Sequence, residues 1–328
     1  MPEGYLHLTY EQRCQIYALL QSARSQADIA RQLGVTRSTV SRELARNAGA
    51  RGYRFKQAHA TAAQRRHQAS NRPRKMTPYV VALIERIMTQ QQWSPEQIAG
   101  RLAREGIVSI SHETIYRHVW EDKKDGGNLH LHLRHNGKKY NKRQSRNSGR
   151  GLIPGRVDID QRPAIVAAKS RIGDWEADTI IGAKHQGAVM SHVERKSKYT
   201  KLAKLPANTA NAVVTASRRV LAPLAHRVET ITYDNGKEFA AHAAIANSLG
   251  ALCFFAKPYH AWQRGLNEHT NGLVRQYFQK GSDLSILSHA DVQRVEDKLN
   301  SRPRKILGSK TPHEVFFNVT NPCVALHC

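Results

Sequence analysis

Three acidic residues in the second half of the chain stand where a sheet and a helix could gather carboxylates. Asp178 lies within the otherwise apolar stretch WEADTIIG, and Asp234 follows the apolar positions Ile231 and Tyr233 directly. Ligands of open α/β sheets collect at strand ends, so an Asp that ends a strand is well placed to bind one. Glu268 lies in a stretch with helical spacing. Three carboxylates repel one another unless cations are present, and ligands that are all oxygen suit Mg²⁺ or Mn²⁺.

The chemistry that such a site predicts is phosphoryl transfer on a nucleic acid. Two metal ions in the site would bind the attacking and the leaving oxygen of an in-line displacement at a phosphodiester. With water as the nucleophile the product is a cut strand. With a DNA 3′-hydroxyl as the nucleophile the product is a joined strand, so one site could catalyse both reactions.

Spacing alone leaves the choice of acids open. Asp174, Glu176 and Asp178 alternate along one expected strand, so all three share a face and the period of two cannot choose among them. The sequence Asp-Asn-Gly that begins at Asp234 is also typical of an ordinary turn. A single Glu on a helix, such as Glu268, is more often a plain surface residue.

The elements that must position these acids follow an α/β pattern after Pro163. Strands are predicted over residues 175–182, 188–195, 198–205, 228–234 and 251–256. Helices are predicted from Asn208, over 237–249 and around Glu268. Three strands, helix, strand, helix, strand and helix is the order of a ribonuclease-H-like fold.

The first half begins with a helix-turn-helix signature. Gly34 supplies the turn between two short helices, and Thr36 can cap the second. Helical spacing gives these helices a buried face made of Ile29, Ala30, Leu33, Val35, Val40 and Leu44. The second helix would offer to a DNA major groove the side chains of Arg37, Ser38, Thr39, Ser41 and Arg42. The alternative is a plain helical hairpin within an unrelated fold.

A second module of the same kind starts at Trp93. Ser94 stands at an N-cap, Pro95 at the first helical position and Gln97 where a capping box requires it. A turn at Gly106 and a helix from about His112 repeat the architecture. We expect this module to contact DNA, and the alternative is a packing or dimerisation role.

Basic segments mark the predicted domain borders. Nine Lys or Arg and no acid occupy residues 46–75, and seven basic residues with no acid occupy residues 134–150. Such runs are typical of solvated linkers that also neutralise phosphates. The predicted division is a helix-turn-helix domain over 1–50, a basic linker over 51–76, a second helix-turn-helix-like module over 77–121, a basic linker over 122–165 and an α/β catalytic domain over 166–328.

Composition names the class of partner. The chain has 328 residues and a formal net charge of +25, an excess of cations that predicts a nucleic-acid partner, with a ribosomal-type or merely soluble basic protein as the alternative. No signal peptide or membrane span is visible, so we expect a cytoplasmic protein that associates with the nucleoid when bound to DNA, with no membrane partner. The four cysteines form no CxxC pair, which argues against a zinc site or a disulfide framework.

Three blocks of the sequence closely resemble the catalytic blocks of one family of proteins. These blocks are WEADTIIG, TYDNGKEF and PYHAWQRGLNEHTNGLVRQYFQKG. They resemble the insertion-sequence family called IS-thirty, members of the DDE transposases, and the resemblance extends to the first helix-turn-helix and to the terminal KTPHEVF. The family's three acids match Asp178, Asp234 and Glu268, and the 33 residues between the last two have the spacing characteristic of the family.

The resemblance implies a retroviral-integrase-like catalytic core and the function of a transposase. Such a protein binds the terminal inverted repeats of its own element, assembles as a homo-oligomer, and cleaves and joins element and target DNA with two Mg²⁺ ions, or with Mn²⁺. Where the family has Asn-Glu-Asn this chain has Asn267, Glu268 and His269, and we expect His269 to point away from the acid. Candidate contacts to DNA are Trp262, Gln263, Arg264, Asn271 and Arg275.

Two other functions compete with this interpretation. One is a transcriptional regulator with two helix-turn-helix units and no catalytic activity, which would bind DNA without regard to Mg²⁺. The other is a structure-selective nuclease on the same fold, which would cut DNA without joining 3′ ends to a target. Several long matches in order favour the transposase.

Overall fold

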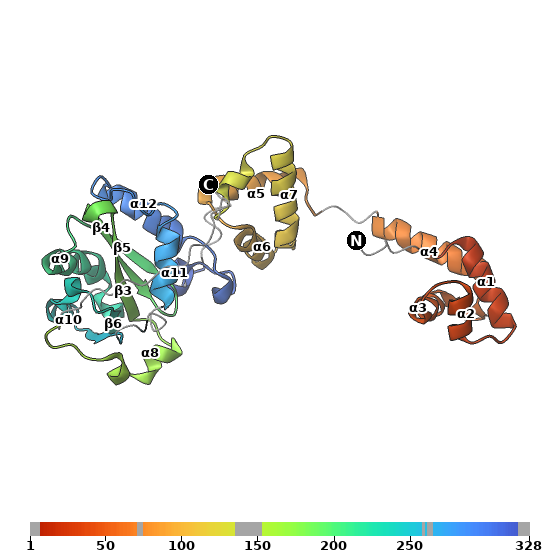
Figure 1. Cartoon of the computed structure of the whole chain (residues 1–328), viewed down its shortest axis with the longest axis horizontal. Coiled ribbons are helices and arrows are strands. Elements are labelled where there is room, and N and C mark those ends of the chain that lie inside the picture. The colour runs from red at the N-terminus through yellow and green to blue at the C-terminus, as the bar shows by residue number, and fades with distance from the viewer. Residues whose placement is uncertain (1–6, 71–74, 135–152, 258–259, 261–264, 321–328) are drawn as a thin grey trace. The chain divides into compact units, whose positions relative to one another are not determined.

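The computed structural model describes residues 7–70, 75–134, 153–257, 260 and 265–320. The chain divides into two compact units, residues 1–74 and residues 75–328, and each is described by itself. Within the second unit a small helical module precedes an α/β domain (Figure 1).

The first unit is helical. Its elements are α1 (Tyr10–Gln21), α2 (Gln26–Gln32), α3 (Arg37–Asn47), the short hairpin of β1 (Ala48–Gly49) and β2 (Gly52–Tyr53), and α4 (Phe55–Ser70). Gly34 has a φ of +65°, and the Thr36 hydroxyl accepts the backbone N–H of Thr39, which confirms the predicted turn and cap. Its core contains Leu8, Ile16, Ile29, Ala30 and Val40.

The basic segment predicted as a linker over residues 51–76 is largely a helix. Residues 55–70 form α4, whose Phe55 ring meets the Tyr10 ring of α1 edge-on at 5.6 Å between centroids. Arg65 of α4 also donates to the carbonyl oxygen of Arg46 at 2.8 Å. The linker prediction is wrong here because it weighed charge and overlooked the alanine and glutamine residues, which favour a helix, and the aromatic anchor at Phe55.

The helical module of the second unit extends further than predicted. It consists of α5 (Pro78–Arg86), a π-helical turn η1 (Ile87–Gln91), α6 (Pro95–Arg104), α7 (His112–Lys124) and a 3₁₀ turn η2 (Leu129–His132). The capping box of Ser94 and Gln97 is present. Leu129 is buried in the module's core, and Leu133 packs against it. Residues 122–134 therefore belong to this module and not to a linker, whereas residues 135–152 lie outside the described part of the chain.

The α/β domain contains a mixed five-stranded sheet. The strands are β3 (Asp174–Ile181), β4 (Ala188–Glu194), β5 (Thr200–Leu205), β6 (Thr230–Tyr233) and β7 (Leu252–Phe255), in the spatial order β5-β4-β3-β6-β7. β3, β4 and β5 pair antiparallel, while β6 pairs parallel with both β3 and β7. The sheet agrees with the ribonuclease-H-like arrangement expected from the element order.

Helices cover both faces of the sheet. They are α8 (Ala164–Ala168), α9 (Ala210–Leu221), α10 (His242–Leu249), α11 (Gly265–Val274), α12 (His289–Asn300) and α13 (Pro312–Phe317). Short 3₁₀ turns cover Ile159–Gln161, Ala183–His185, Ala222–Arg227, Lys237–Phe239 and Lys305–Leu307. In Figure 1, α9 and α10 lie on one side of the sheet and α11 and α12 on the other.

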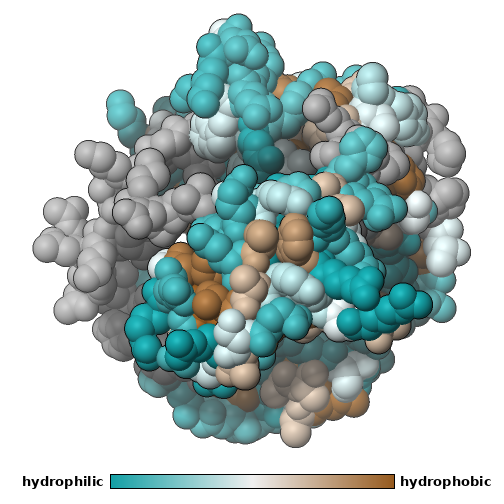
Figure 2. All heavy atoms as spheres, turned by 90° about the vertical axis from the view of Figure 1, so that its right-hand side faces the viewer, coloured by the Kyte–Doolittle hydropathy of each residue, from teal (hydrophilic) through white to brown (hydrophobic). Residues whose placement is uncertain are grey.

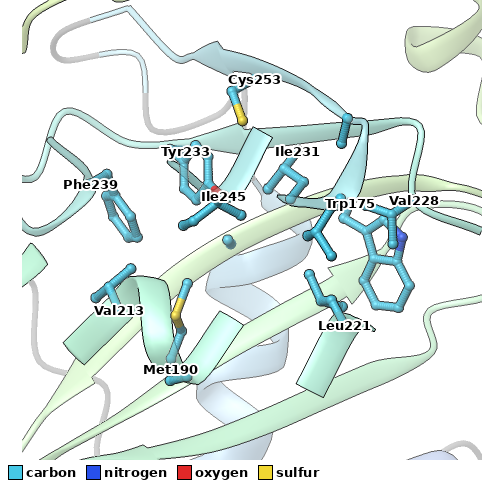
Figure 3. Packing of buried hydrophobic residues seen from close by; sticks show 14 of the residues in the cluster. Trp175, Met190, Val213, Leu221, Val228, Ile231, Tyr233, Phe239, Ile245 and Cys253 are labelled. Carbon is cyan, nitrogen blue, oxygen red and sulfur yellow. The ribbon is translucent and has the colours of Figure 1, made fainter. Parts of the chain in front are cut away.

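Each face has its own hydrophobic cluster, because alternate residues of a strand point to opposite faces. Trp175 and Ala177 of β3 point to the cluster beneath α9 and α10, which Figure 3 shows together with Leu221 and Ile245. Ile180 points to the cluster beneath α11 and α12. Ile153 is buried in the first cluster, so the folded domain includes residues 153–165, which were predicted as linker.

A buried ion pair joins the helical module to the α/β domain within the second unit. Arg101 of α6 donates two hydrogen bonds of 2.8 Å to the Glu314 carboxylate, and both side chains are buried. Glu314 also accepts the backbone N–H of Thr311 and so completes the capping box of α13. Burial by itself raises the pKa of Glu314, but the hydrogen bonds from Arg101 and from Thr311 outweigh burial and hold the pKa below its ordinary value.

None of the described helices is long and apolar enough to cross a membrane. Figure 2 shows a face on which hydrophilic residues predominate and hydrophobic residues form small, separate groups.

Candidate active site

The three acids of β3 have different surroundings. Asp174 is fully buried, where Arg171 donates to it at 3.0 Å and the Thr230 hydroxyl at 2.8 Å. Glu176 is buried too and accepts a hydrogen bond of 2.7 Å from Arg195. Asp178 is only partly buried. The fold therefore uses the first two carboxylates internally, and these contacts favour Asp178 as the acid available for chemistry.

Asn271 ties Asp178 to the helix that carries Glu268. The Asn271 amide donates to Asp178 Oδ2 at 2.9 Å, and its Oδ1 accepts the Ser191 hydroxyl of β4 at 2.9 Å. Asp178 and Ser191 are themselves partners in the β3–β4 register. One side chain of α11 thus spans two strands and fixes the orientation of the Asp178 carboxylate.

The buried Glu176 holds the start of the same helix. Its Oε2 accepts the backbone N–H of Asn267 at 3.3 Å, while its Oε1 accepts from Arg195. A carboxylate at the first turn of a helix satisfies a free N–H group and interacts favourably with the helix dipole. Glu268 is the next residue after Asn267, so Glu176 positions the turn from which Glu268 projects.

Asp234 follows β6 directly, next to β3. The parallel register pairs Asp174 with Thr230 and Glu176 with Thr232. Continued by two residues, this register places the backbone of Asp178 opposite that of Asp234. The Oδ1 atom of Asp234 accepts the backbone N–H of Gly236 at 2.9 Å, which shows that the Asp-Asn-Gly sequence also forms the turn that its composition predicts.

Glu238 is a further acid in this region that the sequence reasoning missed. Its Oε1 accepts the hydroxyl of Thr179, the residue after Asp178, at 2.8 Å. An ideal Cβ built on Gly236 would lie 2.4 Å from Glu238 Oε2 and 2.9 Å from Asp234 Oδ1, so a larger residue there would displace the two carboxylates. The signal was present in the block TYDNGKEF, where Glu238 lies four residues after Asp234.

Glu268 lies in the first turn of α11 and is exposed. It precedes Asn271 by three residues, one helical turn from the side chain that contacts Asp178. In the described part of the chain, no three Asp, Glu, His or Cys side chains lie close enough together to hold a metal ion. The β3–β6 register brings the backbones of Asp178 and Asp234 side by side, but the side chains of the three acids do not form one compact carboxylate cluster. Like charges repel, and neighbouring donors within the fold hold Asp178 and Asp234.

The predicted contacts to DNA have several outcomes. Of the five side chains predicted to contact DNA from α3, Thr39 is partly buried. The other four are exposed: Arg37, Ser38, Ser41 and Arg42. Trp262, Gln263 and Arg264 lie outside the described residues. Arg275 donates to the carbonyl oxygen of Ile181 at 2.8 Å. For Asn271, the contacts to Asp178 and Ser191 favour a positioning role in place of the predicted contact to DNA.

Comparison with known proteins agrees with this architecture. Residues 5–47 match the model of a helix-turn-helix domain, and residues 52–119 match that of a homeodomain-like domain. Helix-turn-helix modules followed by a ribonuclease-H-like domain are typical of proteins that recombine DNA. Relatives that match nearly the full length of the chain identify the family.

The chain is 47% identical over 316 residues to the transposase for insertion sequence element IS4351 of Bacteroides fragilis, covering 96% of this chain and 97% of that protein. It is 38% identical to the transposase for insertion sequence element IS1086 of Cupriavidus metallidurans, covering 97% and 96%. It is 33% identical to the transposase InsI for insertion sequence element IS30A of Escherichia coli, covering 94% and 83%. The chain therefore belongs to the IS-thirty (IS30) family of insertion-sequence transposases, and DNA is its partner.

Proposed function

We propose that this transposase binds the terminal inverted repeats of its own element through the first helix-turn-helix, assembles on them as a homo-oligomer, and cleaves and joins DNA at Asp178, Asp234 and Glu268. The observation that carries the assignment of these acids is the Asn271 contact. It links the strand of Asp178 to the helix of Glu268, while the β3–β6 register brings Asp234 alongside.

The donor chemistry of these residues fits Mg²⁺ or Mn²⁺. Carboxylate oxygens on two adjacent strands and a helix are ligands that such hard cations prefer, and Asp178, Asp234 and Glu268 would hold two of them. When bound, the ions activate the attacking water or 3′-hydroxyl and take up charge on the leaving 3′ oxygen. Asn271 orients Asp178 by donating to Oδ2, which leaves Oδ1 to accept the backbone N–H of Thr179.

Helix α3, the second helix of the first helix-turn-helix, supports recognition of the element ends. Arg37, Ser41 and Arg42 are exposed on α3, whereas Val40 points into the core. Arginine on such a helix can bind guanine edges with two hydrogen bonds, and serine can bind either base edges or phosphates. The same active site then receives target DNA for the joining step.

Labelled element ends incubated with Mg²⁺ test the assignment of the acids. The substitutions Asp178→Asn and Asp234→Asn should abolish both cleavage and joining while binding of the ends persists, because each removes a charged metal ligand and leaves the fold intact. Glu121→Gln, at an exposed position of α7, is the matched control and should cut normally. Unchanged cutting by Asp234→Asn would contradict the proposal.

The Asn271→Ala variant tests the positioning role. Loss of the donor frees the Asp178 carboxylate, so the variant should need more Mg²⁺ for half-maximal cutting and should recover in part at high Mg²⁺, with unchanged affinity for the element ends. Ser191→Ala, which removes the second contact of Asn271 and a longer hydrogen bond to the Asp178 carbonyl oxygen but keeps the Asn271 donor, should show a weaker form of the same defect. Weaker DNA binding with an unchanged Mg²⁺ requirement would instead assign Asn271 to the DNA.

A further inference from the structure

A group of arginines that have no carboxylate hydrogen-bond partner among the described residues lies beside α11. Arg302 follows α12 and is 1% exposed; it donates to Gln276 Oε1 at 2.9 Å and also to the Tyr277 hydroxyl. Its guanidinium carbon lies 5.4 Å from the centroid of the Tyr277 ring. Arg304 comes two residues later, and Arg134 comes from the end of the helical module. We call Arg134, Arg302 and Arg304 the arginine cluster.

The cluster contains buried donors that find no acceptor. Among the described residues, the Nε atoms of all three arginines and the Nη2 atom of Arg134 are buried without a hydrogen-bond partner. A buried donor left without a partner costs about 1–3 kcal/mol. Two other buried arginines of the same unit have a carboxylate partner, Arg195 in Glu176 and Arg101 in Glu314.

The charges of the arginine cluster also indicate that an anion is missing from it. Burial lowers the pKa of Arg302 to about 10, and burial together with repulsion from Arg134 and Arg302 lowers the pKa of Arg304 to about 9. No carboxylate is among the groups that act on Arg302 or Arg304, and Glu96, which acts on Arg134, is itself paired with Lys305. Three crowded guanidinium groups in partly desolvated positions require an anion to offset them.

The position of the cluster suggests which anion this is. Arg302 donates to Gln276 and lies against the Tyr277 ring, and these two residues follow α11, the helix whose first turn carries Glu268. Arg134 and Arg304 are partly exposed, whereas Arg302 is buried. A ligand can therefore approach the first two.

We propose that the arginine cluster is a binding site for a backbone phosphate of the DNA next to the catalytic helix. A phosphate supplies both the negative charge and the oxygen acceptors that the cluster lacks, and arginine binds it with two parallel hydrogen bonds. Binding there would hold the strand near the end of α11, the helix that carries Glu268. This inference rests on the proposed function, because it takes DNA as the source of the phosphate. The arginines take part in no step of the reaction.

Salt dependence of DNA binding tests the inference. The full chain carries Asp234→Asn in all samples, so cutting does not enter the measurement. Affinity for an element-end duplex is measured against salt concentration. The slope of log K against log salt is negative, and each lost phosphate contact reduces its magnitude by about 0.9. Arg304→Gln and Arg134→Gln should each lower the slope by about one contact. Arg294→Gln, an exposed position of α12 paired with Asp291, removes the same charge nearby and should leave the slope unchanged.

A second measurement uses inorganic phosphate alone. Phosphate should raise the Tm of the Arg294→Gln control, and Arg304→Gln should lose most of that rise. Equal slopes in Arg304→Gln, Arg134→Gln and the control would overturn the inference. A lower Tm for the cluster variants without any change in slope would also overturn it, because the cluster would then contribute only to packing. If the slopes fall as expected while Asp234→Asn still cuts DNA, the phosphate site stands and the proposed acids fail.

Discussion

The two helix-turn-helix modules share an architecture but expose different second helices. On α3, the exposed Arg37, Arg42 and Arg46 face solvent, and the helix's single acid, Glu43, is buried in an ion pair with Arg13 at 2.7 Å. On α7, by contrast, the exposed Arg117 has an exposed Glu four residues before it and another four residues after it. A cationic face suits the phosphates of a duplex, and a face of mixed charge suits them less.

Helix α6 of the second module also has a partner that recognition of bases does not require. Arg101 of α6 is buried against Glu314 of α13, and a side chain on the neighbouring Gly100 would collide with the Ser309 hydroxyl. The second module is therefore fixed to the catalytic domain of its own unit. The difference between the modules teaches that one helical pattern can serve for reading DNA in one place and for a rigid connection in another.

Breaking the Arg101–Glu314 pair should have the largest effect. Arg101→Met leaves the Glu314 carboxylate buried without its cationic partner, and removal of one member of a buried ion pair costs about 3–5 kcal/mol. The free energy of unfolding from urea titration measures the loss. Arg104→Met, on the same helix but exposed, breaks one hydrogen bond to the Gly308 carbonyl and should cost far less. Equal losses in both variants would show that the module is not fixed by this pair.

Substitution in α3 should have the next largest effect. Arg42→Ala should weaken binding to the element ends by about 1–3 kcal/mol and reduce the preference for them over a scrambled duplex, because it removes a side chain suited to base edges. Arg31→Ala, an exposed change on α2 of the same unit, removes an equal charge and should leave the preference intact. Fluorescence anisotropy with both duplexes measures the ratio. A preference that survives Arg42→Ala would remove α3 from base recognition.

Local patterns predicted the parts of the fold whose causes are local. The five strands lie within two residues of their predicted bounds, and the caps of Ser94 and Thr36 are present, because periodicity and capping depend on neighbouring residues. Helix α4 was missed because its charge suggested a linker, and its stability depends on the contact of Phe55 with Tyr10 in α1.

The choice among the acids of β3 could not come from the pattern itself. Asp174, Glu176 and Asp178 have the same period, and most of the partners that distinguish them are distant in sequence. Thr230, for example, is 56 residues from Asp174, and Asn271 is 93 residues from Asp178. The family resemblance selected Asp178 in advance, and the contacts of the three carboxylates supply the physical reason that the sequence lacked.

The smallest effect is expected from Arg117→Ala on α7. Because Glu113 and Glu121 lie one turn away on either side, they already offset much of the field of Arg117, so its loss should change binding of the element ends by only about 0.2–0.5 kcal/mol, as for helix ion pairs in general. Anisotropy at low salt, where surface charges are least screened, gives the most sensitive comparison with Arg42→Ala.

The reciprocal variant sharpens the contrast. Glu113→Gln with Glu121→Gln leaves α7 with a cationic face like that of α3, and it should strengthen binding to specific and scrambled duplexes alike, with a steeper dependence on salt. If Arg117→Ala instead abolished the preference for element ends as Arg42→Ala does, the second module would read bases as well. Its ion pair with Glu314 would then hold a second reading helix at a fixed position on the catalytic domain.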